Sequence, residues 1–270
     1  MRQQSSLARL LASAAVTAML AAGLGGCQTM SDITGSLTSK AETGASPDTD
    51  PRRAAELYGE RYRANPKDPD AALAYGQALR ATGQRGQAVA VLEQATIAHP
   101  GNRALLAGYG RALADNGNFQ QSFDVLTRAH SPDNPDWRIL SVQGTTLDQL
   151  GRHEDARRYY ASALKIVPDE PSVLSNLGLS YVLSKDLPKA EENLRRAYAS
   201  GGADARVRQN LGLVVGLQGR FAEAESIVKA DLPADEAATN VAYLKQMLSR
   251  KDSPRDGAGT VPVASLSRPN

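Results

Sequence analysis

The stretch WRILSVQGTTLDQLGRHEDARRYYASALKIVPDE, residues 137–170, decides the fold of this chain. Its composition predicts two helices that pack closely around a turn. Gly144 lies where a side chain would push two close backbones apart, and Ala156 is small at the facing point of the second half. Gly151 suits a helix end that needs a positive φ. Pro168 ends the second helix, because proline cannot continue a helical hydrogen-bond ladder.

The same spacing returns every 34 residues along the chain. A fixed period of this length is typical of stacked helical repeats, and 34 is the period of the tetratricopeptide repeat, TPR. The chain resembles that repeat at its small and helix-ending positions. We therefore expect an all-α fold, a TPR superhelix (α-solenoid) of about five helix-turn-helix repeats with capping helices. The glycines that set the phase are Gly76, Gly110, Gly144, Gly178 and Gly212.

The phase of these glycines also divides the chain. Extended backward, it identifies a half repeat at residues 51–68 that caps one end, since terminal repeats commonly differ from inner ones. After the repeats, we expect a capping helix at residues 239–250, in a helical run for which Asp235 is the expected N-cap. Residues 251–270 hold three prolines and scattered charges, and are expected to be a disordered tail. The five repeats span 69–238, at 69–102, 103–136, 137–170, 171–204 and 205–238.

The first 26 residues are typical of a cleaved lipoprotein signal peptide. They contain two arginines and no acid, followed by an apolar run of about 15 residues. That run is shorter than the roughly 20 residues a membrane span needs. It ends in Leu24-Gly25-Gly26-Cys27, which resembles the bacterial lipobox. The resemblance implies cleavage between Gly26 and Cys27, with lipidation of Cys27, the only cysteine. The alternative is that Cys27 is a small apolar residue in a signal cut elsewhere.

A lipidated Cys27 would attach the protein to a membrane through its lipid anchor, since two or more acyl chains bind stably. Gln28 follows it. Lipoproteins retained in the inner membrane usually carry Asp at this place, so we expect the outer membrane of a Gram-negative bacterium, facing the periplasm. Residues 27–50 are rich in Ser, Thr, Gly, Asp and Pro. We expect them to form a flexible linker between anchor and repeats.

Composition and motifs argue against catalysis. The formal net charge is only +2, without the basic face that a nucleic-acid binder needs. The three histidines, His99, His130 and His153, have no cysteine partner or tight ligand spacing, so we expect capping or solvated side chains and no metal. No glycine-rich phosphate loop or paired carboxylates occur. We therefore expect no cofactor, no small-molecule substrate and no enzymatic activity.

TPR stacks bind partners mainly along the concave surface made by the first helices of their repeats. A carboxamide on that surface can hold a peptide backbone, because it supplies both a donor and an acceptor. Neighbouring leucines can accept apolar side chains. The polar N-terminal half of this expected groove contains Gln77, Arg80, Arg111, Asp115, Ser141, Thr145 and Asp148. The more apolar C-terminal half contains Asn176, Leu179, Gln209, Asn210 and Leu213.

Two alternatives to a free groove stay open. The C-terminal capping helix could fold back over the apolar half and fill it. Asn176 and Asn210 occupy the same position of successive repeats. They could serve only as hydrogen-bond partners between repeats, without touching a ligand.

Several stretches between the repeat positions carry a closer resemblance. They include PDW at 135–137, SNLGLSY at 175–181 and RVRQNL at 206–211. Through them, residues 52–250 resemble the TadD lipoproteins of tight-adherence (Flp-type) pilus assembly. The resemblance implies a non-enzymatic, pilotin-like scaffold whose partners are the pilus secretin or other assembly components. The alternatives are a TPR lipoprotein adaptor for outer-membrane protein insertion or for an envelope protease, and a cell-wall enzyme.

Overall fold

The structure, a computed structural model, describes residues 50–200 and 204–252. Within these ranges the regular elements are twelve helices, and there is no strand. The predicted signal peptide, the lipidation site at Gly26 and Cys27, and the linker up to residue 49 lie outside the described residues. So does the expected tail beyond residue 252.

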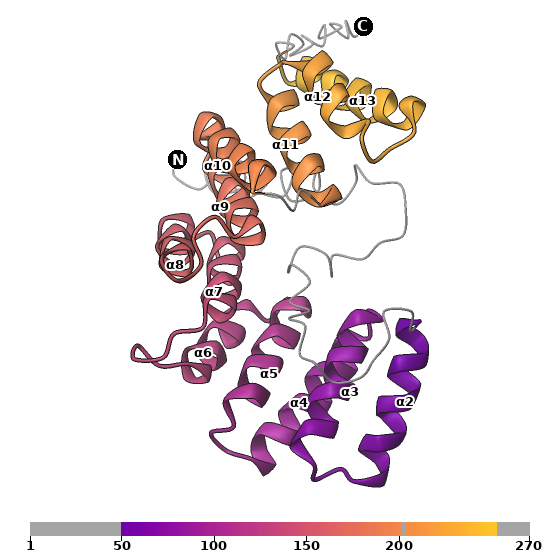
Figure 1. Cartoon of the computed structure of the whole chain (residues 1–270), viewed down its shortest axis with the longest axis vertical. Coiled ribbons are helices and arrows are strands. Elements are labelled where there is room, and N and C mark those ends of the chain that lie inside the picture. The colour runs from indigo at the N-terminus through magenta and orange to yellow at the C-terminus, as the bar shows by residue number, and fades with distance from the viewer. Residues whose placement is uncertain (1–49, 201–203, 253–270) are drawn as a thin grey trace, which may run out of the picture.

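The helices pair in chain order into five hairpins, with one extra helix at each end (Figure 1). The prediction of an all-α, TPR-type solenoid is confirmed. The helices are α2 (Pro51–Ala64), α3 (Pro69–Ala81), α4 (Arg85–Ala98), α5 (Arg103–Asp115), α6 (Phe119–Ala129), α7 (Trp137–Gln149), α8 (His153–Ile166), α9 (Pro171–Leu183), α10 (Leu187–Ala199), α11 (Ala205–Leu217), α12 (Phe221–Val228) and α13 (Ala234–Asp252).

The turn inside each hairpin requires a left-handed residue. Gly151 takes this conformation between α7 and α8, with φ 76°. Lys185 stands at the equivalent place between α9 and α10 and adopts φ 63°. A residue with a Cβ pays about 1–2 kcal/mol for that conformation. The fourth repeat therefore keeps its turn at a cost that the packing of its two helices offsets.

The glycines at the eighth position of each repeat let the paired helices touch. A Cβ built on Gly76 would lie 2.5 Å from Cγ of Leu92, and one on Gly144 would lie 2.5 Å from Cε1 of Tyr160. Both distances are far inside van der Waals contact, so the expected close approach is confirmed. The side chains that fill this space stand 16 residues later in each repeat: Leu92, Leu126, Tyr160, Leu194 and Val228.

The C-terminal end differs from its expected bounds. Helix α13 begins at Ala234, so the expected limit between repeats and cap at residues 238–239 falls inside this helix. Asp235 lies in its first turn and is not its N-cap. Pro233 explains the earlier start, because proline fixes a helical φ and needs no hydrogen-bond donor at a helix N-terminus. Ala237 is fully buried, which holds the first turn of α13 against the stack.

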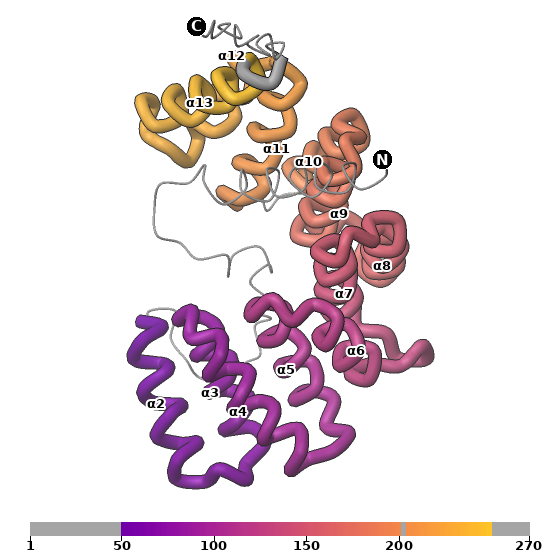
Figure 2. The backbone as a smooth tube through the Cα atoms, turned by 180° about the vertical axis from the view of Figure 1, so that it is seen from behind, coloured from indigo at the N-terminus to yellow at the C-terminus, as the bar shows by residue number. Residues whose placement is uncertain are grey.

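The first helices of the hairpins form the inner wall of the solenoid. Each of α3, α5, α7 and α9 contacts the next first helix along the chain, ending with α11. Figures 1 and 2 show α7 on the hollow side of the stack and α8 on the outside. In the described part of the chain, no helix is long and apolar enough to cross a bilayer.

Candidate functional site

The N-terminal half of the concave wall is tied together by an ion pair. Arg80 on α3 donates from Nε to Asp115 on α5 at 2.6 Å. The Asp115 side chain is only 4% exposed, and that of Arg80 is 17% exposed. Partly buried charge pairs persist only with good geometry. The predicted groove residue Arg80 is thus committed to a contact between the first and second repeats.

Arg111 lies on the same wall, one helical turn before Asp115. Its Nε atom is buried and has no hydrogen-bond partner among the described residues. Burial lowers the pKa of Arg111 to about 10, and the positive charges of Arg80 and Arg138 lower it further, against opposition from Asp136. The guanidinium remains charged at neutral pH. It is a buried cation with free donor capacity.

Asn176 and Asn210 make matching contacts between repeats. Nδ2 of Asn176 donates to Oγ of Ser141 at 3.2 Å, and Nδ2 of Asn210 donates to Oγ of Ser175 at 2.9 Å. The alternative of an inter-repeat hydrogen bond is therefore observed for both. Their carboxamide oxygens take no part in these bonds, so their role towards a ligand stays a prediction.

The remaining predicted groove residues are accessible to different degrees. Gln77 is exposed, whereas Leu179, Gln209 and Leu213 are partly exposed. The C-terminal helix does approach this wall. Leu244 of α13 lies 2.5 Å from where a Cβ of Gly216 would be, on the last turn of α11. Helix α13 thus covers the C-terminal end of the wall, as the other alternative anticipated, and leaves Leu213 partly open.

Asp148 was expected on the concave surface but is buried, at 7% exposure. Its carboxylate accepts hydrogen bonds from Oγ of Ser180 at 2.8 Å and from the Tyr160 hydroxyl at 3.0 Å. Nδ1 of His153 lies 2.9 Å from it. Burial raises the pKa of Asp148, and these hydrogen bonds oppose the rise. The network is structural, because it joins the third and fourth repeats through buried atoms.

This network had a signal in the sequence. Tyr160 stands where other repeats place Leu or Val, and a buried tyrosine hydroxyl usually finds a hydrogen-bond partner. His153 is bonded to Asp148, and His99 caps the end of α4 while its Nε2 contacts the carbonyl of Lys67 at 2.7 Å. No group of three His, Cys, Asp or Glu residues in the described ranges could hold a metal ion.

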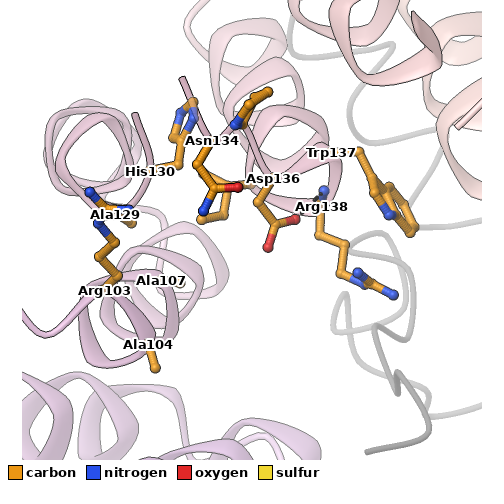
Figure 3. A pocket seen from close by; sticks show the side chains of 11 residues that line it. Arg103, Ala104, Ala107, Ala129, His130, Asn134, Asp136, Trp137 and Arg138 are labelled. Carbon is orange, nitrogen blue, oxygen red and sulfur yellow. Dashed lines mark hydrogen bonds between the residues drawn. The ribbon is translucent and has the colours of Figure 1, made fainter. Parts of the chain in front are cut away.

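A pocket of about 380 Å³ lies between the second and third repeats (Figure 3). It was not anticipated from the sequence. It is enclosed by the start of α5, the end of α6, the connecting segment and the start of α7. Its lining residues are Arg103, Ala104, Ala107, Ala129, His130, Asn134, Pro135, Asp136, Trp137, Arg138 and Ile139. A signal existed in Pro132, which stands two residues before the usual helix-ending proline.

Two family profiles match the chain. The profile of anaphase-promoting complex, cyclosome, subunit 3 matches residues 51–129, and a tetratricopeptide repeat profile matches residues 141–205. A curated relative, the BBSome complex member BBS4 of Bos taurus, is 23% identical over 155 residues, or 57% of this chain. The chain spans only 30% of the length of that relative.

Solved structures with the same fold include two from pilus systems. PilW, a widely conserved type IV pilus biogenesis factor, aligns with a TM-score of 0.63 at 19% identity, over 72% of this chain and 91% of its own. PilF of Pseudomonas aeruginosa aligns with a TM-score of 0.52 at 17% identity, over 74% and 85% respectively. At these identities the likeness concerns the fold. The chain is a TPR-type helical solenoid.

Proposed function

We propose that the protein is a periplasm-facing outer-membrane lipoprotein that serves as a scaffold for assembly of a tight-adherence (Flp-type) pilus. The observation that carries the proposal is the alignment with PilW, which extends over 91% of that pilus biogenesis factor. The resemblance of the stretches at 175–181 and 206–211 to TadD lipoproteins supports the same system. In this proposal the concave wall binds assembly components, the secretin among them, and the Cys27 lipid keeps the complex at the outer membrane.

The wall has the chemistry of a protein-binding surface. It presents a buried, incompletely bonded cation at Arg111 and open carboxamide oxygens at Asn176 and Asn210. Partly exposed leucines follow at its C-terminal end. A surface that alternates charged, hydrogen-bonding and apolar groups suits an extended or helical protein segment. Repeat proteins commonly use such concave surfaces for binding.

The test is a deletion of the gene in its native host, with surface pili and secretin multimers measured together. We expect pili to be lost and secretin multimers to fall, and the wild-type gene to restore both. Normal pili and normal multimers in the deletion strain would refute the proposal.

Anchor variants test the membrane part separately. Cys27→Ser should release the protein into the soluble periplasmic fraction and restore few pili. Gln28→Asp keeps the lipid but should move the protein to the inner membrane, and Gln28→Asn is its matched control. If Cys27→Ser still fractionates with the outer membrane, the lipid anchor is excluded, whatever the pilus result.

A further inference from the structure

The pocket between the second and third repeats exists because one helix is a turn short. Helix α6 ends at Ala129, whereas α4 and α8 continue to Ala98 and Ile166, three residues further in their repeats. Pro132 explains the difference, because the residue before a proline is driven out of the helical region. The segment then closes on itself, with Asn134 N–H donating to the carbonyl of Ser131 at 3.0 Å. The space of the missing turn becomes the pocket.

Two buried polar atoms of the lining residues have no partner in the described ranges. They are Nδ1 of His130 and Nε of Arg138. The other ring nitrogen of His130 lies 3.1 Å from Oε1 of Gln143, whose Nε2 donates to Oγ1 of Thr127. Nε2 of His130 therefore carries the proton in this arrangement, and Nδ1 of the neutral ring is an acceptor. A buried polar group without a partner costs about 1–3 kcal/mol, which a ligand can recover.

The pocket is positively charged and partly apolar. Arg103 and Arg138 are among its lining residues, and Arg111 stands one turn along α5 from Ala107. The guanidinium of Arg138 stacks 4.5 Å from the centre of the Trp137 ring, which leaves its N–H edge available for a carboxylate. The N-terminal ends of α5 and α7 add partial positive charge. Figure 3 shows Asn134 and Asp136 between His130 on one side and Arg138 and Trp137 on the other.

We propose that this pocket binds an acidic peptide segment of a partner protein. Carboxylates of the segment meet Arg103, Arg138 and Arg111, and a backbone N–H is accepted by Nδ1 of His130. An apolar side chain packs against Trp137. The inference deepens the proposed scaffold function and rests on it for the nature of the ligand, since it names where a protein partner docks and with what chemistry.

Two features favour a peptide over a phosphate group. The carboxylate of Asp136 is part of the lining, so a dianion would meet repulsion. It also already accepts the backbone N–H of Arg138 at 2.8 Å as the N-cap of α7. The acceptor at His130 requires an N–H group, which a peptide backbone supplies and a phosphate dianion does not. Guanidinium groups bind carboxylates in a planar, two-pronged geometry.

Trp137 is the only tryptophan of the chain, so its fluorescence reports on this pocket. The purified protein is titrated with a decapeptide of alternating Glu and Leu, and with its Gln and Leu counterpart. We expect a saturable change in Trp137 emission with the Glu peptide alone. Arg138→Gln should weaken binding about tenfold, the loss of one charge-assisted hydrogen bond of roughly 1.5–3 kcal/mol. Arg128→Gln, an exposed arginine of α6, removes the same charge and should leave binding unchanged.

A second variant keeps the test valid if Arg138→Gln unfolds. Ala104 is exposed in the first turn of α5 and belongs to the pocket lining. Ala104→Glu places a carboxylate there, where a helix N-terminus favours it. It should raise the melting temperature and abolish binding of the Glu peptide, whereas Ala104→Gln should do neither. Circular dichroism checks that each variant is folded.

The outcomes separate this inference from the scaffold proposal. Equal binding of the Glu and Gln peptides, or equal loss in Arg138→Gln and Arg128→Gln, would overturn it. So would a response of Trp137 to inorganic phosphate or to phosphatidylglycerol vesicles without a response to the Glu peptide. None of these measurements depends on pili, so a host without a piliation defect would defeat the proposed function while leaving the peptide site standing.

Discussion

A missing Cβ at one position of each repeat sets how closely its two helices approach. The facing residue differs between repeats, yet the contact is the same: Leu126 approaches Gly110, and Val228 approaches Gly212, each at 2.5 Å from the absent Cβ. Interiors packed at crystalline density respond to a single added methyl group. The third repeat is the most demanding, because the facing side chain is the ring of Tyr160.

Gly144→Ala should therefore destabilise the protein. The new methyl would fall 2.5 Å from Cε1 of Tyr160, whose hydroxyl is held by Asp148. Overpacking costs about 1–3 kcal/mol, and the better helix propensity of alanine returns up to about 1 kcal/mol. We expect a net loss of about 1–2 kcal/mol by urea unfolding. The matched control is Gly86→Ala on α4, where an added Cβ meets nothing within 4 Å and stability should be unchanged or slightly higher. Equal effects would contradict the close-contact explanation.

Between elements, successive first helices are joined by polar pairs that are 35 residues apart. Arg80 pairs with Asp115, and the two asparagine–serine pairs follow the same separation. One repeat plus one residue brings adjacent first helices into register. The second helices use charge as well. Glu191 of α10 accepts hydrogen bonds from Arg220 at 2.6 and 3.0 Å and from Gln218 at 2.8 Å, which joins the fourth repeat to the fifth.

This junction should be sensitive to acid. The hydrogen bonds from Arg220 lower the pKa of Glu191 from 4.5 to about 2. A carboxyl group with a depressed folded-state pKa contributes stability above its unfolded pKa, and loses that contribution as pH falls through the folded value. We expect wild-type stability to drop between about pH 4.5 and 2 more steeply than that of Glu191→Gln, which is less stable at pH 7. Urea unfolding across this range measures it.

The control for this experiment is Glu192→Gln, an exposed neighbour on the same helix. It should retain the wild-type pH profile. If Glu191→Gln and Glu192→Gln behave alike, the acid sensitivity arises elsewhere in the chain.

At the scale of the molecule, the solenoid is a linear array in which each repeat is held by its neighbours. Stability in such arrays is close to a sum of repeat and interface contributions. The apolar core forms a chain of clusters, the largest in α3–α7 and smaller ones across α7–α9 and α9–α12. The ends are thinner. Helix α2 buries only Ala55 and Gly59, and one residue of α13, Ala237, is a buried hydrophobic.

Hydrogen exchange should follow this gradient. Amides of α5 to α8 lie between repeats on both sides and should exchange slowest, while those of α2 and α13 should exchange fastest through local opening. Mass spectrometry of peptides from the native protein resolves these segments. Removing α13 should speed exchange in α11 and α12 and leave α3 to α6 unchanged. Uniform protection along the chain, or a uniform change on truncation, would show a single cooperative unit instead.

Most of the fold was predictable from the sequence because the repeat is written in local terms. Small residues at the closest approach, turn residues such as Gly151 and helix-ending prolines act within one hairpin, and their period displays the phase. Even Lys185, a departure at a turn, kept the geometry, since the flanking helices impose it. The C-terminal cap was placed less well. Val228 ends a short α12, and the start of α13 follows from Pro233 and the burial of Ala237.

The candidate site was predictable only in part, since side chains that face the concave wall can either meet a partner or bond to the next repeat. The sequence by itself determined the period, the helix pairs and the wall on which Arg80, Asn176 and Asn210 lie. Only the tertiary structure decided that these residues also link repeats, that Asp148 is buried, and that the pocket at His130 opens where α6 ends early. The physical reason is range: turns and close contacts within a hairpin depend on residues near in sequence, whereas hydrogen bonds and cavities between hairpins depend on how whole helices stack.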